Sequence, residues 1–349
     1  MKARVGLKDI AQEAGVSVVT ASLALRDAPD SNTQARVSAA RREEIRQIAA
    51  RMGYRTNAAG RILKSKKISD IGLLFFEETE QIRGHAGFTD LNIQVNRICR
   101  RNNIRYQLDW FDPIREPDGI PAILTDGLVG GVLIAGCPFG ASERFLAEQI
   151  NIPFVRIDEE GQYCVLQDYI TPLREALAYL NATGHRRVGL INGPKMFRRF
   201  RETERVFLEE ATRYHWDEPE GRIFTIPPYD DFVKNSILAE RAIFERPDFA
   251  DAVLVASGIQ ASGILPLIHR RGLKVPEDVS FVSIATEDWE TERAIPRLTA
   301  VEANHARLAE EAVSMLRELM ETGNVRRPRV LIPEKFSIRD SVINRSVSF

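Results

Sequence analysis

Cysteine is scarce in this chain of 349 residues, with only Cys99, Cys137 and Cys164 and no CxxC pair. This argues against a disulfide framework or a zinc knuckle and favours a reducing compartment. No apolar run approaches the roughly 18–20 residues of a membrane span. The first residues also lack the apolar segment of a signal peptide. We therefore expect a cytoplasmic protein that does not associate with membranes.

The motifs of common enzyme classes are also missing. Five histidines are widely spaced without an HExxH, and there is no GxSxG, phosphate-binding loop or GxGxxG. His185 stands in a Gly-His-Arg-Arg turn before a strand, where packing or a hydrogen bond explains it better than catalysis. We expect no enzyme activity, no cofactor and no metal.

Charge is distributed unevenly along the chain. Residues 1–67 contain 14 Lys and Arg against 6 Asp and Glu, a net charge of +8, whereas the remainder carries −9. A basic segment on an acidic body is typical of proteins that bind a polyanion through that segment. A solvated helical surface of mixed charge would give the same totals, so charge alone does not decide between the two.

The basic segment has the spacing of short helices. Residues 7–14 place apolar side chains on one helical face, and Gly15 ends that helix. Ser17 is a suitable N-cap for a second helix over 18–25, and a third is expected over 39–52. Two helices around a tight turn predict a helix-turn-helix, in which the second helix enters the major groove of DNA. A plain helical hairpin is the alternative.

From Asp70 onward, strand-sized apolar runs alternate with longer helical stretches. This alternation predicts parallel sheets that are covered by helices on both faces. Nine strands suit two doubly wound lobes better than one. They are expected at 71–76, 106–111, 131–136, 154–158, 187–191, 222–226, 252–257, 280–285 and 329–333.

Several motifs are similar to those of one family. The head contains LKDIAQEAGVSVVTASLAL and VSAARREEIRQIAARMGYRTNAAGRILK, and the body contains TGHRRVGLI, VPEDVS and the pair Leu298-Thr299. Together they resemble the LacI/GalR family of bacterial transcription regulators over essentially the whole chain. The resemblance implies an α/β protein with an N-terminal all-α helix-turn-helix headpiece and two doubly wound parallel-sheet lobes of the periplasmic-binding-protein type.

The resemblance also implies how the chain is divided. An effector would bind between the two lobes, at the carboxyl ends of their strands. The expected parts are a headpiece over 1–56, a hinge helix and linker over 57–69, a first lobe over 70–168 with 300–328, and a second lobe over 169–299 with 329–345.

Residues that contact DNA are implied in the same way. The hinge motif of this family stands here at 57–63, and the resemblance implies that residues 58–64 fold into a helix on the operator and insert an apolar wedge, here Leu63, into the minor groove. The hydroxyls of the second helix can bond phosphates. The expected DNA-binding residues are Ser17, Val18, Val19, Thr20, Ser22, Leu23, Tyr54, Asn57, Leu63 and Lys64.

The head departs from the family at the second helix. Val18, Val19 and Leu23 are apolar where polar side chains are usual. They can contact thymine methyl groups but cannot hydrogen-bond to bases, so specificity should depend on DNA shape and the hinge. Alternatively, they face the headpiece core. The loop over 26–36 is longer than in the family, and the sequence leaves open whether it contacts DNA.

Two residues match positions that contact the effector in this family. Asp158 follows a strand and matches an acidic position, and Arg201 falls near a ligand-binding arginine, although Arg198 or Arg199 could take its place. Surface salt bridges are the alternative for both. Ser257-Gly258 replaces the family's Asn-Asp, so an aspartate that grips sugar hydroxyls is missing. A simple free monosaccharide is therefore a poor candidate. The expected effector-binding residues are Phe76, Asp158, Arg201, Ser257 and Trp289.

These observations predict a transcription regulator, more specifically a repressor. It is expected to bind double-stranded, pseudo-palindromic operator DNA as a homodimer and to respond to a small molecule. The last residues contain no leucine heptads, which favours a dimer over a tetramer. The alternative is a small-molecule-binding protein of the periplasmic-binding type without DNA function. That alternative predicts a secretion signal and no basic helical head.

Overall fold

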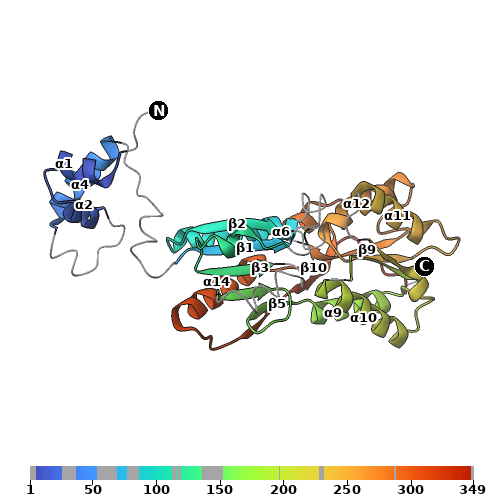
Figure 1. Cartoon of the computed structure of the whole chain (residues 1–349). Coiled ribbons are helices and arrows are strands. Elements are labelled where there is room, and N and C mark those ends of the chain that lie inside the picture. The colour runs from blue at the N-terminus through green and yellow to red at the C-terminus, as the bar shows by residue number, and fades with distance from the viewer. Residues whose placement is uncertain are drawn as a thin grey trace. The chain divides into compact units, whose positions relative to one another are not determined.

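The protein divides into two compact units, a head over Met1–Lys67 and a body over Ile68–Phe349. The structure is a computed structural model (Figure 1). It describes residues 5–25, 37–52, 69–76, 86–111, 116, 119–135, 152–195, 197–227, 232–286 and 288–346.

Three helices form the described part of the head: α1 (Leu7–Glu13), α2 (Val18–Ala24) and α4 (Ala39–Arg51). Ser17 and Ser38 are the N-caps of α2 and α4, since their hydroxyls accept hydrogen bonds from the backbone N–H groups of Thr20 and Arg41. A small core of buried apolar side chains joins the helices: Ile10, Ala14, Ala24, Val37, Ile45 and Ala49.

The first lobe of the body is built on a six-stranded parallel sheet of order β11-β5-β4-β3-β1-β2. Its central strands are buried on both faces and read as continuous apolar runs, whereas the edge strands β11 and β2 are partly exposed. The elements are β1 (Ile71–Phe76), α6 (Ala86–Arg101), β2 (Tyr106–Phe111), α7 (Ala122–Thr125), β3 (Gly131–Ala135), β4 (Phe154–Ile157), β5 (Cys164–Asp168), α14 (His305–Thr322) and β11 (Arg329–Pro333).

The second lobe has a sheet of order β12-β10-β9-β8-β6-β7, parallel except for β12. Its elements are α9 (Ile170–Ala182), β6 (Val188–Asn192), α10 (Arg198–Arg213), η2 (Glu220–Arg222), β7 (Ile223–Thr225), α11 (Phe232–Phe244), β8 (Ala252–Val255), α12 (Gly258–Arg270), β9 (Ser280–Thr286), α13 (Asp288–Arg293), β10 (Thr299–Glu302) and β12 (Lys335–Ser337).

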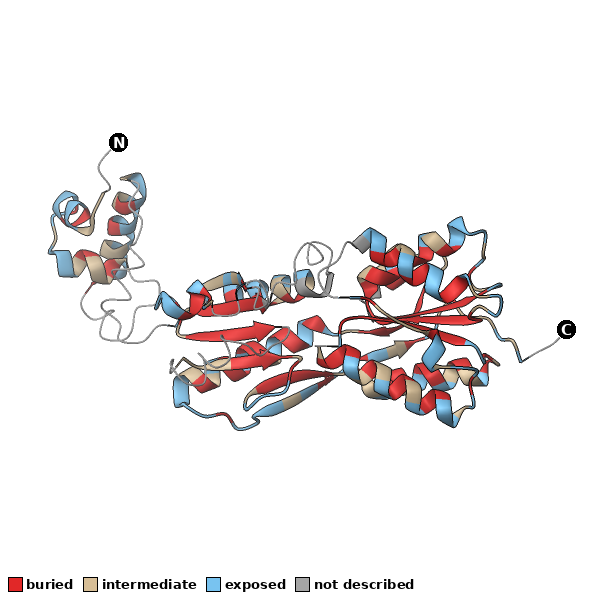
Figure 2. Cartoon of the chain, turned by 45° about the vertical axis from the view of Figure 1, so that its right-hand side comes forward, coloured by how far each residue is buried: buried red, intermediate tan, exposed pale blue. Residues whose placement is uncertain are grey.

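Helices cover both faces of each sheet, so each lobe has two apolar clusters. In the second lobe one cluster lies under α9 and α10 and the other under α11 and α12 (Figure 2). In the first lobe, α6 and α14 cover one cluster, and α7 contributes to the other. The expected fold class, a helical headpiece with two doubly wound lobes, is confirmed.

The chain passes between the lobes three times, and two of these passages differ from the expected lobe boundaries. The sequence assigned 300–328 to the first lobe and 329–345 to the second. The structure instead pairs β10 with β9 in the second lobe and β11 with β5 in the first. The reason is that α14 covers the first sheet and only a short connection separates it from β11, which therefore adds to that same sheet.

Strands β5, β10 and β12 were not expected. Parallel neighbours usually need a long crossover, yet only six residues separate β4 from β5. Such a connection suffices because β4 and β5 overlap by just two residue pairs, Arg156↔Cys164 and Ile157↔Val165. Strand β5 then continues beyond the end of β4, so the connection has to run back along β4 by only about two residues.

Separate cores predict separate unfolding. Ile10 is fully buried in the head, and Leu133 is fully buried in the body. We expect Ile10→Ala to destabilise the head by about 2–5 kcal/mol, because it removes buried methyl groups and leaves a cavity. The thermal transition of the body should stay unchanged. Leu133→Ala should do the reverse. Calorimetry of the full chain measures both, and equal shifts of both transitions in either variant would contradict two independent cores.

Candidate DNA interface and ionic cluster between the lobes

A tight turn joins α1 to α2. Gly15 has φ +60°, a left-handed conformation that glycine adopts without strain, and the N–H of Val16 donates to the carbonyl of Ala11 over 2.9 Å. The guanidinium of Arg41 on α4 donates to the carbonyl of Ala14 over 2.6 Å. The helix-turn-helix geometry expected from the sequence is therefore present, and α4 holds it from outside.

The first turn of α2 is open to solvent. Val18 is 42% exposed and Val19 is 65% exposed, so these two valines do not face the headpiece core. Leu23 is only partly exposed and packs against that core, as the alternative proposed. The available apolar surface of α2 is thus concentrated at Val18 and Val19.

Small hydroxyls surround these valines. Ser17 is exposed, and its hydroxyl lies 2.8 Å from the hydroxyl of Thr20; Thr20 and Ser22 are partly exposed. Because an N-cap hydroxyl already accepts a backbone N–H, its remaining capacity suits a phosphate contact through its own hydrogen. The expected contacts Tyr54, Asn57, Leu63 and Lys64, and the loop over 26–36, lie outside the described residues.

In the body, Asp158 follows β4 in an unusual conformation. Its φ is +59°, and Asp is among the residues that tolerate the left-handed region. Its backbone N–H donates to Val165, and its carboxylate accepts the backbone N–H of Gln167 over 3.1 Å. This turn holds Asp158 at the carboxyl end of the first sheet, as the sequence predicted.

Two arginines from the second lobe meet this carboxylate. Arg198 and Arg199 are the first residues of α10 and are only 9% and 8% exposed. The Arg198 guanidinium donates to Asp158 Oδ1 over 2.6 Å, and Arg199 Nε lies 3.6 Å from Asp158 Oδ2. Both guanidinium groups lie over the ring of Tyr169, at 5.1 and 4.3 Å. The salt bridge expected as the alternative role of Asp158 therefore exists, but it is buried rather than on the surface.

A second carboxylate completes the contact with Arg199. Glu334 stands between β11 and β12, where the chain crosses between the lobes, and it accepts from Arg199 Nη2 over 2.5 Å. The amide of Gln167, oriented to satisfy both groups, donates to Glu334 over 3.0 Å and accepts from Arg199 over 2.9 Å. Arg199 of the second lobe is thereby bound to the first lobe, through Asp158 and Gln167, and to the connecting segment, through Glu334.

The third carboxylate caps a helix of the other lobe. Phe197, the N-cap of α10, provides no side-chain hydrogen bond. Glu159 of the first lobe fills that role, since its Oε1 accepts the backbone N–H of Arg198 over 2.8 Å. A carboxylate at a helix N-terminus is favoured by the helix dipole. We call Asp158, Glu159, Arg198, Arg199 and Glu334 the ionic cluster.

Burial determines the protonation behaviour of this cluster. Burial raises the pKa of Glu159, although the hydrogen bond from Arg198 works against that rise. Burial likewise raises the pKa of Glu334 and outweighs the opposing effect of Arg199. Burial opposes the charge of Arg199 as well, but Glu334 and Asp158 hold the pKa of that guanidinium above its ordinary value. Both arginines thus stay charged.

Of the other expected effector residues, Arg201 acts electrostatically on Glu159 of the ionic cluster. Arg201 is exposed and donates to the carbonyl of Lys195 over 3.2 Å. Ser257 is buried at the start of α12, and Trp289 on α13 is 48% exposed with Arg293 over its ring at 5.5 Å. Phe76 ends β1, and its side chain lies outside the described residues.

The sequence analysis missed Glu159, Glu334, Gln167 and Tyr169, and gave Arg198 and Arg199 only as substitutes for Arg201. A usable signal existed for the two glutamates. Each directly follows an apolar strand run, FVRID and RVLIP respectively. Polar residues at the carboxyl ends of parallel strands gather at one edge of the sheet, which is where such folds bind ligands.

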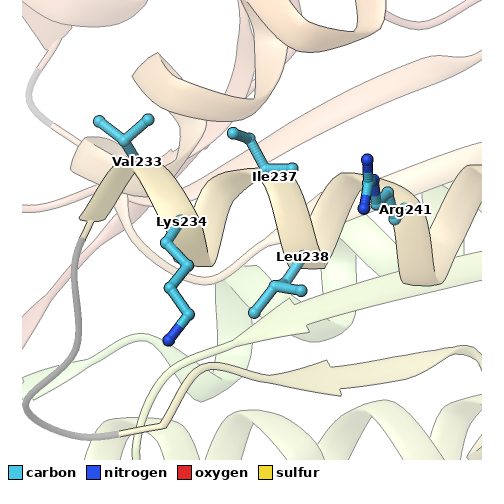
Figure 3. Close-up of a pocket in the computed structure, with 5 residues that line it drawn as sticks. All are labelled: Val233, Lys234, Ile237, Leu238 and Arg241. Atoms are coloured by element: carbon cyan, nitrogen blue, oxygen red, sulfur yellow. The ribbon is translucent and has the colours of Figure 1, made fainter.

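A separate open pocket of about 390 Å³ lies on α11 (Figure 3). All its lining residues come from that one helix: Val233, Lys234, Ile237, Leu238 and Arg241. Val233 is 62% exposed and Leu238 39%. It is therefore an exposed, mainly apolar stripe with two flanking cations. In the described part of the chain, no helix is long and apolar enough to cross a membrane, and no cluster of side chains is arranged to hold a metal ion.

Comparison with known proteins matches both units. Residues 6–57 match the family described as bacterial regulatory proteins, lacI family, and residues 177–342 match the periplasmic binding protein-like domain. The chain therefore contains a DNA-binding regulatory head followed by a ligand-binding type of body.

Whole-chain relatives agree with this division. A probable HTH-type transcriptional repressor, ExuR of Bacillus subtilis, is 23% identical, covering 97% of this chain and 98% of its own length. The HTH-type transcriptional repressor CytR of Escherichia coli K12 is 28% identical, with 91% of each chain covered. The fold also matches the Lac repressor bound to ONPG, with a TM-score of 0.80 at 21% identity, covering 97% of this chain and 100% of that one.

The head, over residues 6–57, thus matches the LacI family of bacterial regulatory proteins, as the sequence motifs indicated, and the chain as a whole is similar to proteins named transcriptional repressors. It is a DNA-binding regulator, and its family is regulatory rather than enzymatic.

The raised pKa of Glu159 predicts a pH effect on stability. A carboxyl whose pKa is higher in the folded chain than in the unfolded chain stabilises the fold at low pH, and this contribution is lost as the pH rises through the folded value. We therefore expect the free energy of unfolding of Glu159→Gln, relative to the unmodified protein, to rise as the pH increases above the ordinary pKa of a glutamate. Urea unfolding measures it.

Glu160 is the matched control. It is exposed, and the hydrogen bond from Arg329 lowers the pKa of Glu160. Its contribution to stability is complete above the ordinary glutamate pKa, so Glu160→Gln should show no rise there and should gain relative stability only as the pH falls below that value. The same slope in both variants would contradict the burial of Glu159.

Proposed function

We propose that this protein is a repressor of the bacterial cytoplasm that binds a pseudo-palindromic operator as a homodimer and is modulated by a small molecule between its lobes. The observation that carries the proposal is the first turn of α2, where Val18 and Val19 are exposed next to the hydroxyls of Ser17 and Thr20. An apolar tip ringed by phosphate-binding groups suits the major groove.

Base readout then depends on few atoms. Val18 and Val19 contact thymine methyl groups, while Leu23 mainly stabilises the headpiece because it packs inward. Since valine offers no hydrogen bond to a base, the remaining specificity comes from DNA shape and from the hinge, where Leu63 is the proposed wedge. The relatives ExuR and CytR are both named transcriptional repressors, which supports repression rather than activation of transcription.

The exposed stripe on α11 supports a homodimer. Val233 and Leu238 give it apolar surface that a single subunit leaves in water. A twofold interface places the same patch of each copy against the other, and a twofold head arrangement reads a palindrome. A solved relative of 20% identity, the Lac repressor, is described as a dimer bound to operator.

The proposed effector is not a simple free monosaccharide. A sugar is usually held by carboxylates that accept its hydroxyls, but here Asp158 is already engaged by Arg198 and by the backbone of Gln167. Ser257-Gly258 replaces the Asn-Asp pair of the family, and Ser257 is buried at the start of α12. The side chains at this site therefore suit another ligand chemistry.

The wedge gives a direct test on DNA. Leu63→Ala should weaken binding to the selected operator far more than binding to random DNA, because only the operator complex contains the kink that the wedge stabilises. Val19→Ala should reduce discrimination at thymine positions. Both are measured by titration of labelled duplexes, with the operator obtained by selection from a random library.

The dependence of affinity on salt tests the phosphate contacts, which operator and random DNA share. Affinity should fall steeply with salt in every variant, because released counterions drive phosphate binding. Equal loss of operator and random binding in Leu63→Ala would contradict the wedge, and no binding to any duplex would contradict the proposed function.

The dimer surface gives a second test. Val233→Asp should convert the dimer to a monomer, because the twofold axis brings two carboxylates together inside an apolar contact. Sedimentation measures the mass, and operator affinity should fall in parallel, since one head reads only half a site. Ile338→Asp is the control: it changes another exposed apolar residue, 57% exposed, and should leave the dimer intact. A dimeric Val233→Asp would exclude the α11 stripe.

A further inference from the structure

The second lobe contributes the hydrogen-bond donors of the ionic cluster. Arg198 and Arg199 contribute two guanidinium groups, and the N-terminus of α10 contributes a backbone N–H. Tyr169 lies beneath both arginines, fully buried, and its hydroxyl has no hydrogen-bond partner in the described structure. Because arginine has no acceptor atom, these groups together suit a negatively charged molecule.

Carboxylates of the protein now occupy these donors. Asp158 and Glu159 come from the first lobe, and Glu334 comes from the segment that crosses between the lobes. Each therefore ties the second lobe to another part of the body. The lobes are held together here by ionic hydrogen bonds.

Such contacts are easily exchanged. Burying a charged pair costs much of what the attraction returns, so the net contribution of the pair is small, whereas an unpaired buried arginine is strongly unfavourable. Arg199 must therefore always have an anionic partner, but the identity of that partner matters little to its energy. A competing anion can therefore replace an internal carboxylate, provided that the displaced carboxylate returns to water instead of staying buried without a partner.

We propose that the ionic cluster is an exchangeable anion site. A small molecule that carries a carboxylate or a phosphate takes Arg198 and Arg199 from Asp158 and Glu334, and so loosens the first lobe from the second. This inference rests on the proposed function, because it assigns a ligand class to the site between the lobes. The displaced carboxylates turn toward solvent, and no covalent bond changes.

The test uses the full chain and hydrogen exchange of the peptides that cover β4, β5 and α10. Sodium phosphate is compared with sodium chloride at equal ionic strength, and gluconate with sorbitol, which differ in one carboxylate. We expect phosphate or gluconate to raise exchange in these peptides by about five-fold or more, the lower end of ordinary coupling between sites. Chloride and sorbitol should not. A response to phosphate alone identifies a phosphate site, and a response to gluconate alone identifies a carboxylate site.

Three variants make the assignment specific. Arg199→Gln should abolish the response, and Arg199→Lys should weaken it, because lysine keeps the charge but loses the planar fork. Asp158→Asn should raise exchange without any added anion. Arg213→Gln, in the last turn of α10 and 72% exposed at its side chain, should respond like the unmodified protein. Thermal unfolding confirms that each variant is folded.

Two results would overturn the proposal: no effect of phosphate or gluconate beyond that of their controls, or an unchanged response in folded Arg199→Gln and Arg199→Lys. Operator binding, measured on the same samples, separates this inference from the proposed function. Intact operator binding without an anion response removes only the anion site. An anion response without binding to any duplex removes only the repressor role.

Discussion

Parallel strands must bury both faces, and the rest of the body depends on this constraint. Helices cover each sheet on two sides, so polar side chains reach the site between the lobes from the strand ends and from the adjoining helix N-terminus. That geometry brings Asp158, Arg199 and Glu334 together from positions far apart in the sequence. The ionic cluster is thus a consequence of sheet packing.

The same cluster relates stability to regulation. Its charges are buried and mutually compensated, so they add little net stability but strongly penalise the loss of any one partner. Glu159 extends the effect to the backbone, since it caps α10 from the other lobe. A molecule that competes for these groups acts directly on the contact between the lobes, which is the kind of two-state element that regulation requires.

The head follows a different principle. Its core is small, and the DNA contact that we propose uses what the core leaves exposed, namely Val18 and Val19 beside Ser17. These are apolar where hydrogen-bonding readers are common, so the recognition that we propose rests on methyl contacts and DNA deformation. Leu23 shows the limit of sequence reasoning here: its helical position alone did not tell whether it faces DNA or core, and packing against the core decided the matter.

The sequence by itself determined the class of protein, because turn chemistry at Gly15 and Ser17 and long apolar runs are local signals. It also predicted Asp158 at a strand end. Only the tertiary structure decided the partners of Asp158, the placement of β11 in the first sheet, and the role of Glu159. These depend on contacts between distant segments, for which spacing along one chain carries no signal. Scarce cysteine and absent catalytic motifs argued against a disulfide framework and against enzymes, and long-range packing located the ionic cluster.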